Sequence, residues 1–350
     1  MAVNLSTKSA DKLTRRSALK HSVIAGSFDD NYSFKGAKTI EIITPVSQPL
    51  NDYQRSGSNR YGTPTELQDV KQELTLTKDK SWSMTIDKGN LQDQNYLKKA
   101  GECVEMQQEE RVIPEYDKHA LEILATKAGT IVAAAAALDK SNVVAEIIKA
   151  GAALDDKEIP SENRTLFVPS EVYALVKLSP EFTGLEKLGN RAISKGTVGM
   201  FDNMRTVKVP ASRWPKNVNF IIVHKKSWTA PKKIHEAKIH KDPPGISGNL
   251  LEGRDYFDAF VLGARASGAY CQVKNGQTVL AAPTIAAATG AVTGASGATV
   301  YHTTDGSDPR YSATRQTGSP VAVTAGMVVK AYATKSGAWD SSVAEATITG

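Results

Sequence analysis

Cysteine is scarce in this sequence, with only Cys103 and Cys271 among 350 residues. The two have no CxxC spacing and no histidine cluster beside them, which argues against a zinc site and against a disulfide framework. Such cysteine usage is typical of a reducing compartment. We expect both thiols to be buried as small apolar groups.

Long apolar stretches are missing too. The longest run, 131–138, is far too short to span a bilayer. No apolar segment follows the basic residues near the N-terminus, so a signal peptide is not expected. These basic residues are Lys12, Arg15, Arg16 and Lys20.

The sequence also lacks the common catalytic motifs, since it contains no GxSxG, no GxxxxGK[ST] and no HExxH. Its six histidines, among them His224, do not pair with carboxylates at ligand spacing. His235 and His240 are five apart on an expected strand and would lie on opposite faces, which disfavours a shared metal. Without a nucleophile–base pair a hydrolase is not supported. We predict no catalytic, cofactor-binding or metal-binding residues, and no enzymatic activity.

Two patterns near the C-terminus resemble ligand sites only superficially. Gly290, Gly294 and Gly297 could suggest a phosphate-binding loop, but no strand-to-helix context surrounds them. Asp305 and Asp308 could suggest calcium, whereas a turn aspartate that bonds its own backbone is the commoner role. We therefore assign the glycines to a linker and first strand, and the aspartates to a turn.

The composition that is present indicates a globular chain of roughly two domains, with 41% apolar residues and a net charge of +6. Residues 279–350 carry four basic and four acidic side chains, so the whole excess lies in the first 278 residues. A mild basic excess suits a surface near phosphate, but it is no nucleic-acid signature by itself.

The first 50 residues look poorly ordered on their own, because Ser, Thr, Lys and Asp dominate them. Residues 8–20 contain five basic side chains against Asp11. This arm either faces nucleic acid or is a solvated tail, and the sequence leaves both interpretations open.

The stretch 253–273 reads as a buried strand at 256–262, a turn of small residues and a second strand at 269–273. Four further runs rich in β-branched residues predict strands, at 39–44, 164–168, 205–209 and 218–224. A short helix is expected at 171–177, directly after Pro169 and Ser170.

Residues 51–88 are mostly polar and predict an extended hairpin. Its two strands would be 67–77 and 81–86, the second with Trp82, Met84 and Ile86 on one face. A two-stranded arm cannot bury enough surface to stand alone, so it should lie on something else, such as a neighbouring subunit.

Helical patterns follow this hairpin. Residues 91–112 predict a long helix, with a break or kink at Ile113 before Pro114. A second helix begins near Pro114 and keeps an apolar seam from Leu121 to Leu138, weakened by Gly129. A third is expected from Ser141 to the residue before Gly151.

Six lysines and one glutamate occur in residues 225–241 and give an extended hairpin one positive face. This face is either a solvated edge guarded by lysines or a loop that grips an acidic neighbour. From about residue 279 the composition changes to short alternating strands separated by turns, which predicts a separate β-sandwich of about 70 residues.

Four segments, in their order and spacing, resemble the major capsid proteins of tailed bacteriophages, whose Hong Kong phage-type fold is shared with herpesvirus capsids. They are Val-Ile-Pro-Glu-Tyr-Asp-Lys-His-Ala (112–120), Asn-Arg-Thr-Leu-Phe-Val-Pro-Ser-Glu-Val-Tyr-Ala-Leu-Val (163–176), Gly-Met-Phe-Asp-Asn-Met-Arg-Thr-Val-Lys-Val-Pro (199–210) and Gly-Arg-Asp-Tyr-Phe-Asp-Ala-Phe-Val-Leu (253–262).

The resemblance implies an α+β capsid fold with an N-terminal arm (1–50), an extended hairpin loop (51–88), a capsid body (89–278) and a C-terminal module (279–350). Within the body it implies a spine helix at 91–130 and an axial domain at 164–215. The strands at 218–228 and 254–262 would lie in the peripheral domain.

The same resemblance implies hexamers and pentamers of an icosahedral shell, a portal and non-specific contact with packaged double-stranded DNA. About 50 residues precede the hairpin, so a separate scaffolding protein is expected. The expected location is the virion, and the host cytoplasm during assembly. No cross-linking residue can be assigned among Lys71, Lys78 and Lys80.

The segment Tyr-His-Thr-Thr-Asp-Gly-Ser-Asp-Pro (301–309) resembles the immunoglobulin-like module at the C-terminus of chitobiases. His302 stands where that family usually has threonine, and only Tyr301, Tyr332 and Trp339 suggest an aromatic platform. Such modules are also appended to phage structural proteins, where this one would be displayed on the outer surface and could bind a decoration protein or a host glycan. The alternative function is a secreted or surface carbohydrate-binding protein.

Overall fold

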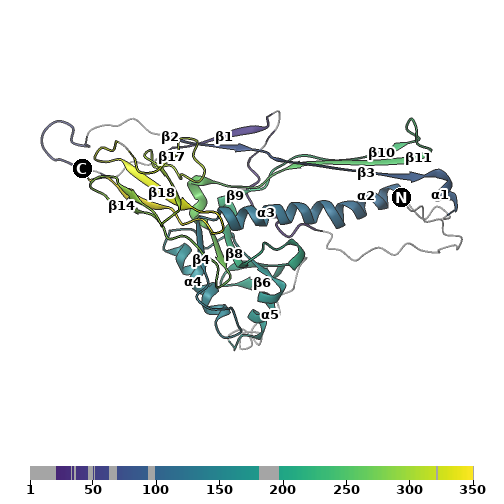
Figure 1. Cartoon of the computed structure of the whole chain (residues 1–350), viewed down its shortest axis with the longest axis horizontal. Helices are drawn as coiled ribbons and strands as arrows, with labels where there is room; N and C mark the ends of the chain where they lie inside the picture. Colours follow the sequence, from purple (N-terminus) through teal and green to yellow (C-terminus); the bar gives the residue numbers. More distant parts are fainter. Residues whose placement is uncertain are drawn as a thin grey trace.

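The computed structural model describes residues 21–32, 34, 37–45, 50, 52–62, 69–93, 99–180, 197–320 and 322–349. Figure 1 shows a body of helices around a sheet, a long arm extending from its upper edge, and a C-terminal all-β unit at the opposite end. The mixture of helices and strands agrees with the predicted α+β class. The predicted basic stretch 8–20 lies outside the described residues.

A six-stranded sheet forms the centre of the body, in the order β4-β13-β8-β5-β7-β6. Every residue of β8 is buried, because both faces of the sheet are covered; this explains its unbroken apolar run. The predicted strands at 164–168, 205–209, 218–224 and 269–273 are confirmed. The strands are β4 (Thr130–Ala133), β5 (Arg164–Pro169), β6 (Thr197–Phe201), β7 (Met204–Val209), β8 (Val218–His224) and β13 (Ala269–Val273).

Helices pack on both faces of this sheet and divide the core into two clusters. Residues of α3 join Phe167, Ile221 and Cys271 on one face. On the other face, α4 (Val143–Asp155) and α5 (Ser170–Leu178) cover Leu166 and Phe220. The expected stop of α4 at Gly151 is wrong, because Gly151 is itself buried and the buried stripe continues beyond it to Leu154.

The arm contains one long helical path. It follows the short α1 (Lys88–Asp93) and consists of α2 (Ala100–Gln107), the π-helical turn η1 (Gln108–Val112) and α3 (Ile113–Lys127). The predicted break at Ile113 is wrong, since Ile113 has helical angles. Pro114 falls in the first turn of α3, where the hydrogen-bond pattern changes, and there its missing N–H is tolerated.

The predicted continuation of this helix to Leu138 is also wrong, because α3 ends at Lys127 and the chain enters the sheet as β4. Gly129 allows this change of direction. A Cβ atom at Gly129 would lie 2.0 Å from the carbonyl oxygen of Ala266, so only glycine permits the approach. Ala266 belongs to the short 3-10 segment η5 (Gly263–Gly268).

We therefore predict that Gly129→Ala lowers the free energy of unfolding by about 1–3 kcal/mol, because backbone must move to admit the methyl group. Urea denaturation of the full chain measures this. Gly101→Ala is the matched control, since Gly101 lies in α2 with no atom within 4 Å of the added Cβ. The control should stabilise the chain by up to about 1 kcal/mol through helix propensity. Equal values for the two variants would contradict the prediction.

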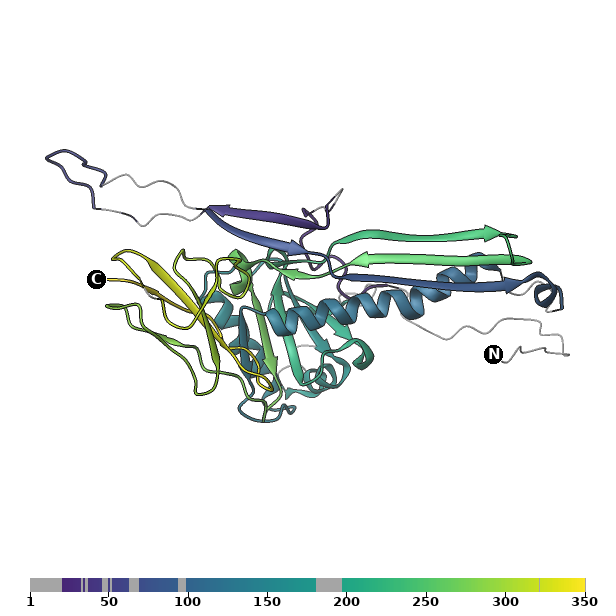
Figure 2. The ribbon, with the colours of Figure 1, turned by 45° about the horizontal axis from the view of Figure 1, so that its top comes forward.

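A three-stranded antiparallel sheet, β10-β11-β3, runs along this helix, as Figure 2 shows. Its strands are β3 (Lys78–Asp87), β10 (Lys232–Lys241) and β11 (Gly248–Phe257), and β11 pairs with both neighbours. The predicted strand 256–262 is thus two elements. The second is β12 (Phe260–Val261), which turns away to pair with β9 (Trp228–Thr229).

The predicted hairpin at 51–88 has the wrong strand pairing. β2 (Asp69–Thr75) pairs with β1 (Thr39–Pro45), whereas β3 belongs to the arm sheet. The two-stranded ribbon is therefore β1–β2, and its base packs on an apolar cluster that includes Phe34, Leu74 and Leu262. The strand predicted at 39–44 is confirmed.

The C-terminal unit contains a two-stranded and a four-stranded sheet, in the orders β14-β15 and β17-β16-β18-β19. β16 and β18 are two of the short alternating strands predicted for this part of the chain. Its strands are β14 (Thr284–Ile285), β15 (Val292–Thr293), β16 (Thr299–Thr303), β17 (Gln316–Thr317), β18 (Val328–Thr334) and β19 (Ala344–Thr347). Two 3-10 turns, η3 (Ala211–Arg213) and η4 (Lys225–Ser227), complete the body.

Candidate assembly surfaces

The β1–β2 ribbon carries an exposed aromatic tip. Leu50 and Tyr61 are the two most exposed large apolar side chains among the described residues, at 100% and 85%. Tyr53 contacts Tyr61 edge to face, with ring centroids 5.1 Å apart. A hydrogen bond of 2.9 Å from the Gln54 N–H to the Arg60 carbonyl closes the loop. A shaped apolar tip that projects into solvent is the kind of surface that another protein covers.

A polar junction fixes the base of this ribbon to the body. Asp258 accepts hydrogen bonds of 2.8 Å from both the N–H and the hydroxyl of Thr77, which lies between β2 and β3. Its other oxygen lies 2.7 Å from Nε2 of His119 on α3. Burial acts to raise the pKa of Asp258, but these hydrogen bonds outweigh it and hold the pKa below its ordinary value. The charged carboxylate therefore joins the ribbon, β12 and the long helix.

The outer half of the arm is only two layers thick. No residue of α2 or η1 is buried, whereas α3 buries six residues against the body. Trp82 on β3 packs over Gly253, where a Cβ would lie 2.3 Å from the indole ring. One helix on a three-stranded sheet leaves apolar side chains half exposed, so this arm would gain stability from a further covering layer.

Residues 21–29 of the expected N-terminal arm are anchored in the body rather than poorly ordered. Ile24 is completely buried in the main core. The Asp117 carboxylate on α3 accepts hydrogen bonds from the Ser22 hydroxyl, from the Val23 N–H at 3.0 Å and from Arg213 at 2.7 Å. Burial raises the pKa of Asp117, and these three hydrogen bonds oppose that effect. The arm therefore begins from a fixed point on the body.

The positive face predicted on β10 is largely used within the chain. Lys233 donates to the Ala37 carbonyl at 2.6 Å, and the Lys232 ammonium lies 3.9 Å from the centre of the Tyr116 ring. The remaining described contacts are ion pairs, namely Lys238–Glu236 (3.3 Å), His240–Glu252 (3.3 Å) and His235–Asp255 (2.5 Å). The sequence did not reveal the partners of His235 and His240, because pairing of β10 with β11 brings Asp255 and Glu252 beside them.

The aromatic residues of the C-terminal unit are engaged in internal contacts. Tyr301 stacks on Tyr332 with centroids 5.5 Å apart, and the Arg315 guanidinium lies 4.9 Å from the Tyr301 ring centre. Trp339 and Tyr311 pack against the main core of the body. The three residues suggested as a sugar platform are therefore already in contact with other side chains.

The turn at 305–309 has the predicted backbone role. Asp305 accepts a hydrogen bond of 3.0 Å from the Ser307 N–H, and Asp308 accepts one of 3.0 Å from the Arg310 N–H.

A cavity of about 610 Å³ lies near this turn, where the C-terminal unit, the body and the ribbon meet. Most of its charged lining is paired within the chain: Lys71 with Glu41 at 3.2 Å, Lys330 with Glu345 at 3.1 Å, and Arg310 with Asp308 at 2.7 Å. These pairs favour a structural role for the cavity.

The described residues offer few groups suited to metal binding or catalysis. The described residues contain no group of three or more potential metal ligands. Within the same ranges, the one hydrogen bond of the His119 ring joins it to Asp258, which also accepts from the Thr77 hydroxyl. Burial raises the pKa of the Cys271 thiol, whereas Cys103 is only half buried, contrary to expectation. None of the described helices combines the length and apolar character needed to cross a lipid bilayer.

Comparison with known sequences gives one match. Residues 274–345 match the family model described as the chitobiase/beta-hexosaminidase C-terminal domain. This confirms the resemblance noted for the C-terminal unit. No curated protein matches the chain by sequence.

Comparison with solved structures gives a consistent result for the fold. A structure of Mycobacterium phage Che8 matches with a TM-score of 0.58 at 16% identity, over 77% of this chain and 98% of that one. The capsid structure of cyanophage P-SCSP1u gives 0.59 at 12% identity, over 78% and 93%. The mature capsid of bacteriophage PhiM1 gives 0.58 at 12% identity, over 79% and 93%. The chain therefore has the phage capsid fold, as its sequence motifs predicted.

Proposed function

We propose that this chain is the major capsid protein of a tailed bacteriophage, a structural protein without catalytic activity. The observation that carries the proposal is the match to two phage capsid structures over 93% of their chains, together with a match to a Mycobacterium phage Che8 structure over 98% of its chain. The chain thus spans nearly the full length of the compared proteins. Its C-terminal unit has its own family match.

The geometry supports a protein that is completed by copies of itself. The aromatic ribbon tip and the thin outer arm both expose apolar surface that the chain does not cover. A closed shell covers such surfaces by repeating one set of contacts around symmetry axes. One standard protein contact buries roughly 1,600 Å², and a shell subunit makes several.

In finer detail, we propose hexamers and pentamers that close an icosahedral shell around double-stranded DNA. A separate scaffolding protein and a portal act during assembly in the host cytoplasm, and the basic N-terminal residues face the packaged DNA without sequence preference. The four-part division stays part of the proposal, with an N-terminal arm (1–50), an extended loop (51–88), a body (89–278) and a C-terminal module (279–350). The projecting ribbon is formed by β1 and β2. The C-terminal unit would lie on the outer surface, where a decoration protein or glycan could reach it.

The test is assembly of the purified full chain, alone and produced together with its scaffolding protein. We expect ring-shaped oligomers or closed shells in electron micrographs, and matching fast-sedimenting species. A chain that remains a monodisperse monomer under both conditions would contradict the proposal. If that monomer also bound chitin, the carbohydrate-binding function would replace it.

A further inference from the structure

We infer that the C-terminal unit is a structural clasp, in which residues 308–312 lock the extended ribbon to the end of the long helix. Three sets of contacts support this inference. The first is at the helix, the second at the ribbon and the third in the apolar core.

At the helix, the unit supplies the C-terminal cap of α3. The last carbonyl groups of a helix lack partners within it and carry partial negative charge. The Arg310 guanidinium donates a hydrogen bond of 2.7 Å to the Ala128 carbonyl, and the Tyr311 hydroxyl donates to the Lys127 carbonyl. Burial raises the pKa of Tyr311, so its hydroxyl stays protonated and remains a donor.

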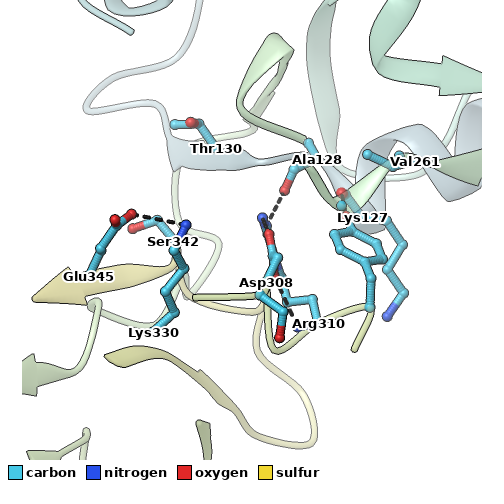
Figure 3. A network of polar contacts seen from close by, with 12 residues as sticks. Lys127, Ala128, Thr130, Val261, Asp308, Arg310, Lys330, Ser342 and Glu345 are labelled. Atoms are coloured by element: carbon cyan, nitrogen blue, oxygen red, sulfur yellow. Dashed lines mark hydrogen bonds and ion pairs between the residues drawn. The ribbon is translucent and has the colours of Figure 1, made fainter. Parts of the chain in front are cut away.

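The capping guanidinium is itself held rigidly. Its Nε and Nη2 donate to the two oxygens of Asp308 at 3.1 and 2.7 Å, as Figure 3 shows beside the bond to Ala128. The Arg310 and Asp308 side chains are only 6% and 11% exposed. A planar guanidinium group whose Nε and Nη2 are held by a carboxylate has its Nη1 in a fixed direction, toward the Ala128 carbonyl. A flexible lysine ammonium is not oriented in this way.

At the ribbon, the same segment pairs with β2. Ser312 forms an antiparallel bridge with Gln72. The Gln72 amide donates to the Val261 carbonyl at 3.1 Å and accepts from the Gly263 N–H at 2.8 Å. The Tyr311 ring packs against Gly263, where an added Cβ atom would lie 3.2 Å from the ring, and so it covers this contact between the segment and β2. One short segment therefore contacts both the helix end and the ribbon base.

In the apolar core, the unit is joined to the body at a second place. Trp339 packs against the main core, and backbone bonds tie it to the segment that enters the unit. Its N–H donates to the Thr278 carbonyl at 2.8 Å, and its carbonyl accepts from the Leu280 N–H at 3.1 Å. Attachment at two separated places fixes the orientation of the unit, whereas a single linker would leave it free to turn.

Hydrogen exchange of the unassembled full chain tests the clasp. In Arg310→Ala, we expect amides of β2 and of the last turn of α3 to exchange about tenfold faster or more, because losing these hydrogen bonds makes local opening easier. Tyr311→Phe removes only the hydroxyl and should produce a smaller increase in the same two places. Arg315→Ala is the matched control, because Arg315 contacts Tyr301 and Tyr332 within the unit.

Hydrogen exchange in β16 and β18 shows whether the C-terminal unit itself stays folded in each variant. If Arg310→Ala unfolds the unit, the exchange rates of Tyr311→Phe at β2 and α3 test the clasp instead. The inference is overturned if the Arg310 and Tyr311 variants match Arg315→Ala at β2 and α3, or if α3 loosens while β2 does not. Any effect of the clasp on shell assembly depends on the proposed function. Exchange is measured before assembly, so failure of the clasp and failure of the capsid proposal are distinguishable.

Discussion

Replacing residues 46–68 by a two-residue Asn-Gly turn should abolish shell formation while leaving a folded subunit. Pro45 and Asp69 are paired directly opposite each other at the end of the ribbon, so a tight turn can join them without disturbing β1 or β2. The ribbon base keeps its apolar cluster and its bond from Thr77 to Asp258. Only the exposed tip is lost.

The measurement is electron microscopy together with sedimentation velocity of the variant. Circular dichroism and the unfolding midpoint serve as the folding control. A milder variant, Tyr53→Ser with Tyr61→Ser, keeps the loop length and should raise the concentration needed for assembly at least about tenfold, because buried aromatic anchors carry much of an interface's free energy. Normal shells from the shortened chain would remove the ribbon tip from the proposed mechanism.

The correction of the strand pairing determines the choice of residues in this experiment. Deleting residues 51–88, the hairpin expected from the sequence, would also remove β3 and hence Trp82 from the arm sheet. Loss of assembly would then have two explanations, a missing contact and a damaged subunit. The shorter replacement separates them.

Asp117→Ala should lower the free energy of unfolding by about 3–5 kcal/mol, which is a large part of the stability of a typical domain. Asp117 is fully buried and its partner Arg213 is 4% exposed, so the variant leaves a buried guanidinium without this carboxylate. It also removes the acceptor of the Ser22 hydroxyl and the Val23 N–H. The N-terminal segment should become sensitive to proteolysis near residues 21–29.

Asp79→Ala is the matched control for this variant. Asp79 and Arg254 are separated by the same 2.7 Å, but their side chains are 43% and 51% exposed. Solvent screens such a pair, so its loss should leave the free energy of unfolding nearly unchanged. Urea denaturation of both variants gives the comparison, and similar losses would show that Asp117 is not the anchor of the arm.

Local patterns predicted those parts of the fold that depend on neighbouring residues in the chain. β8 was found from its β-branched apolar run, and the turn aspartates from their spacing to following N–H groups. The ordered capsid motifs also predicted the fold that the solved structures match. The first two signals lie within a few residues, where propensity and periodicity act directly, whereas the capsid motifs are spread over 112–262 and depend on a family resemblance.

Contacts between distant segments decided the remainder. The helix was expected to pass Gly129, but that residue touches Ala266, 137 positions further along. The histidines seemed to lack partners because His119 and Asp258 are brought together only by folding. Side-chain burial depends on such approaches, so periodicity could not find them.

The sequence by itself determined most strands of the central sheet and the presence of a distinct β-rich unit, because these follow from local residue preferences. It determined the fold class through the resemblance of its ordered motifs to a known family. Only the tertiary structure decided which strands form the ribbon and that Arg310 and Tyr311 complete the end of a helix about 180 residues earlier. The physical reason is that the backbone groups of a strand or a helix end bond to donors and acceptors that are near them in the folded protein. Separation along the chain does not show which groups these will be.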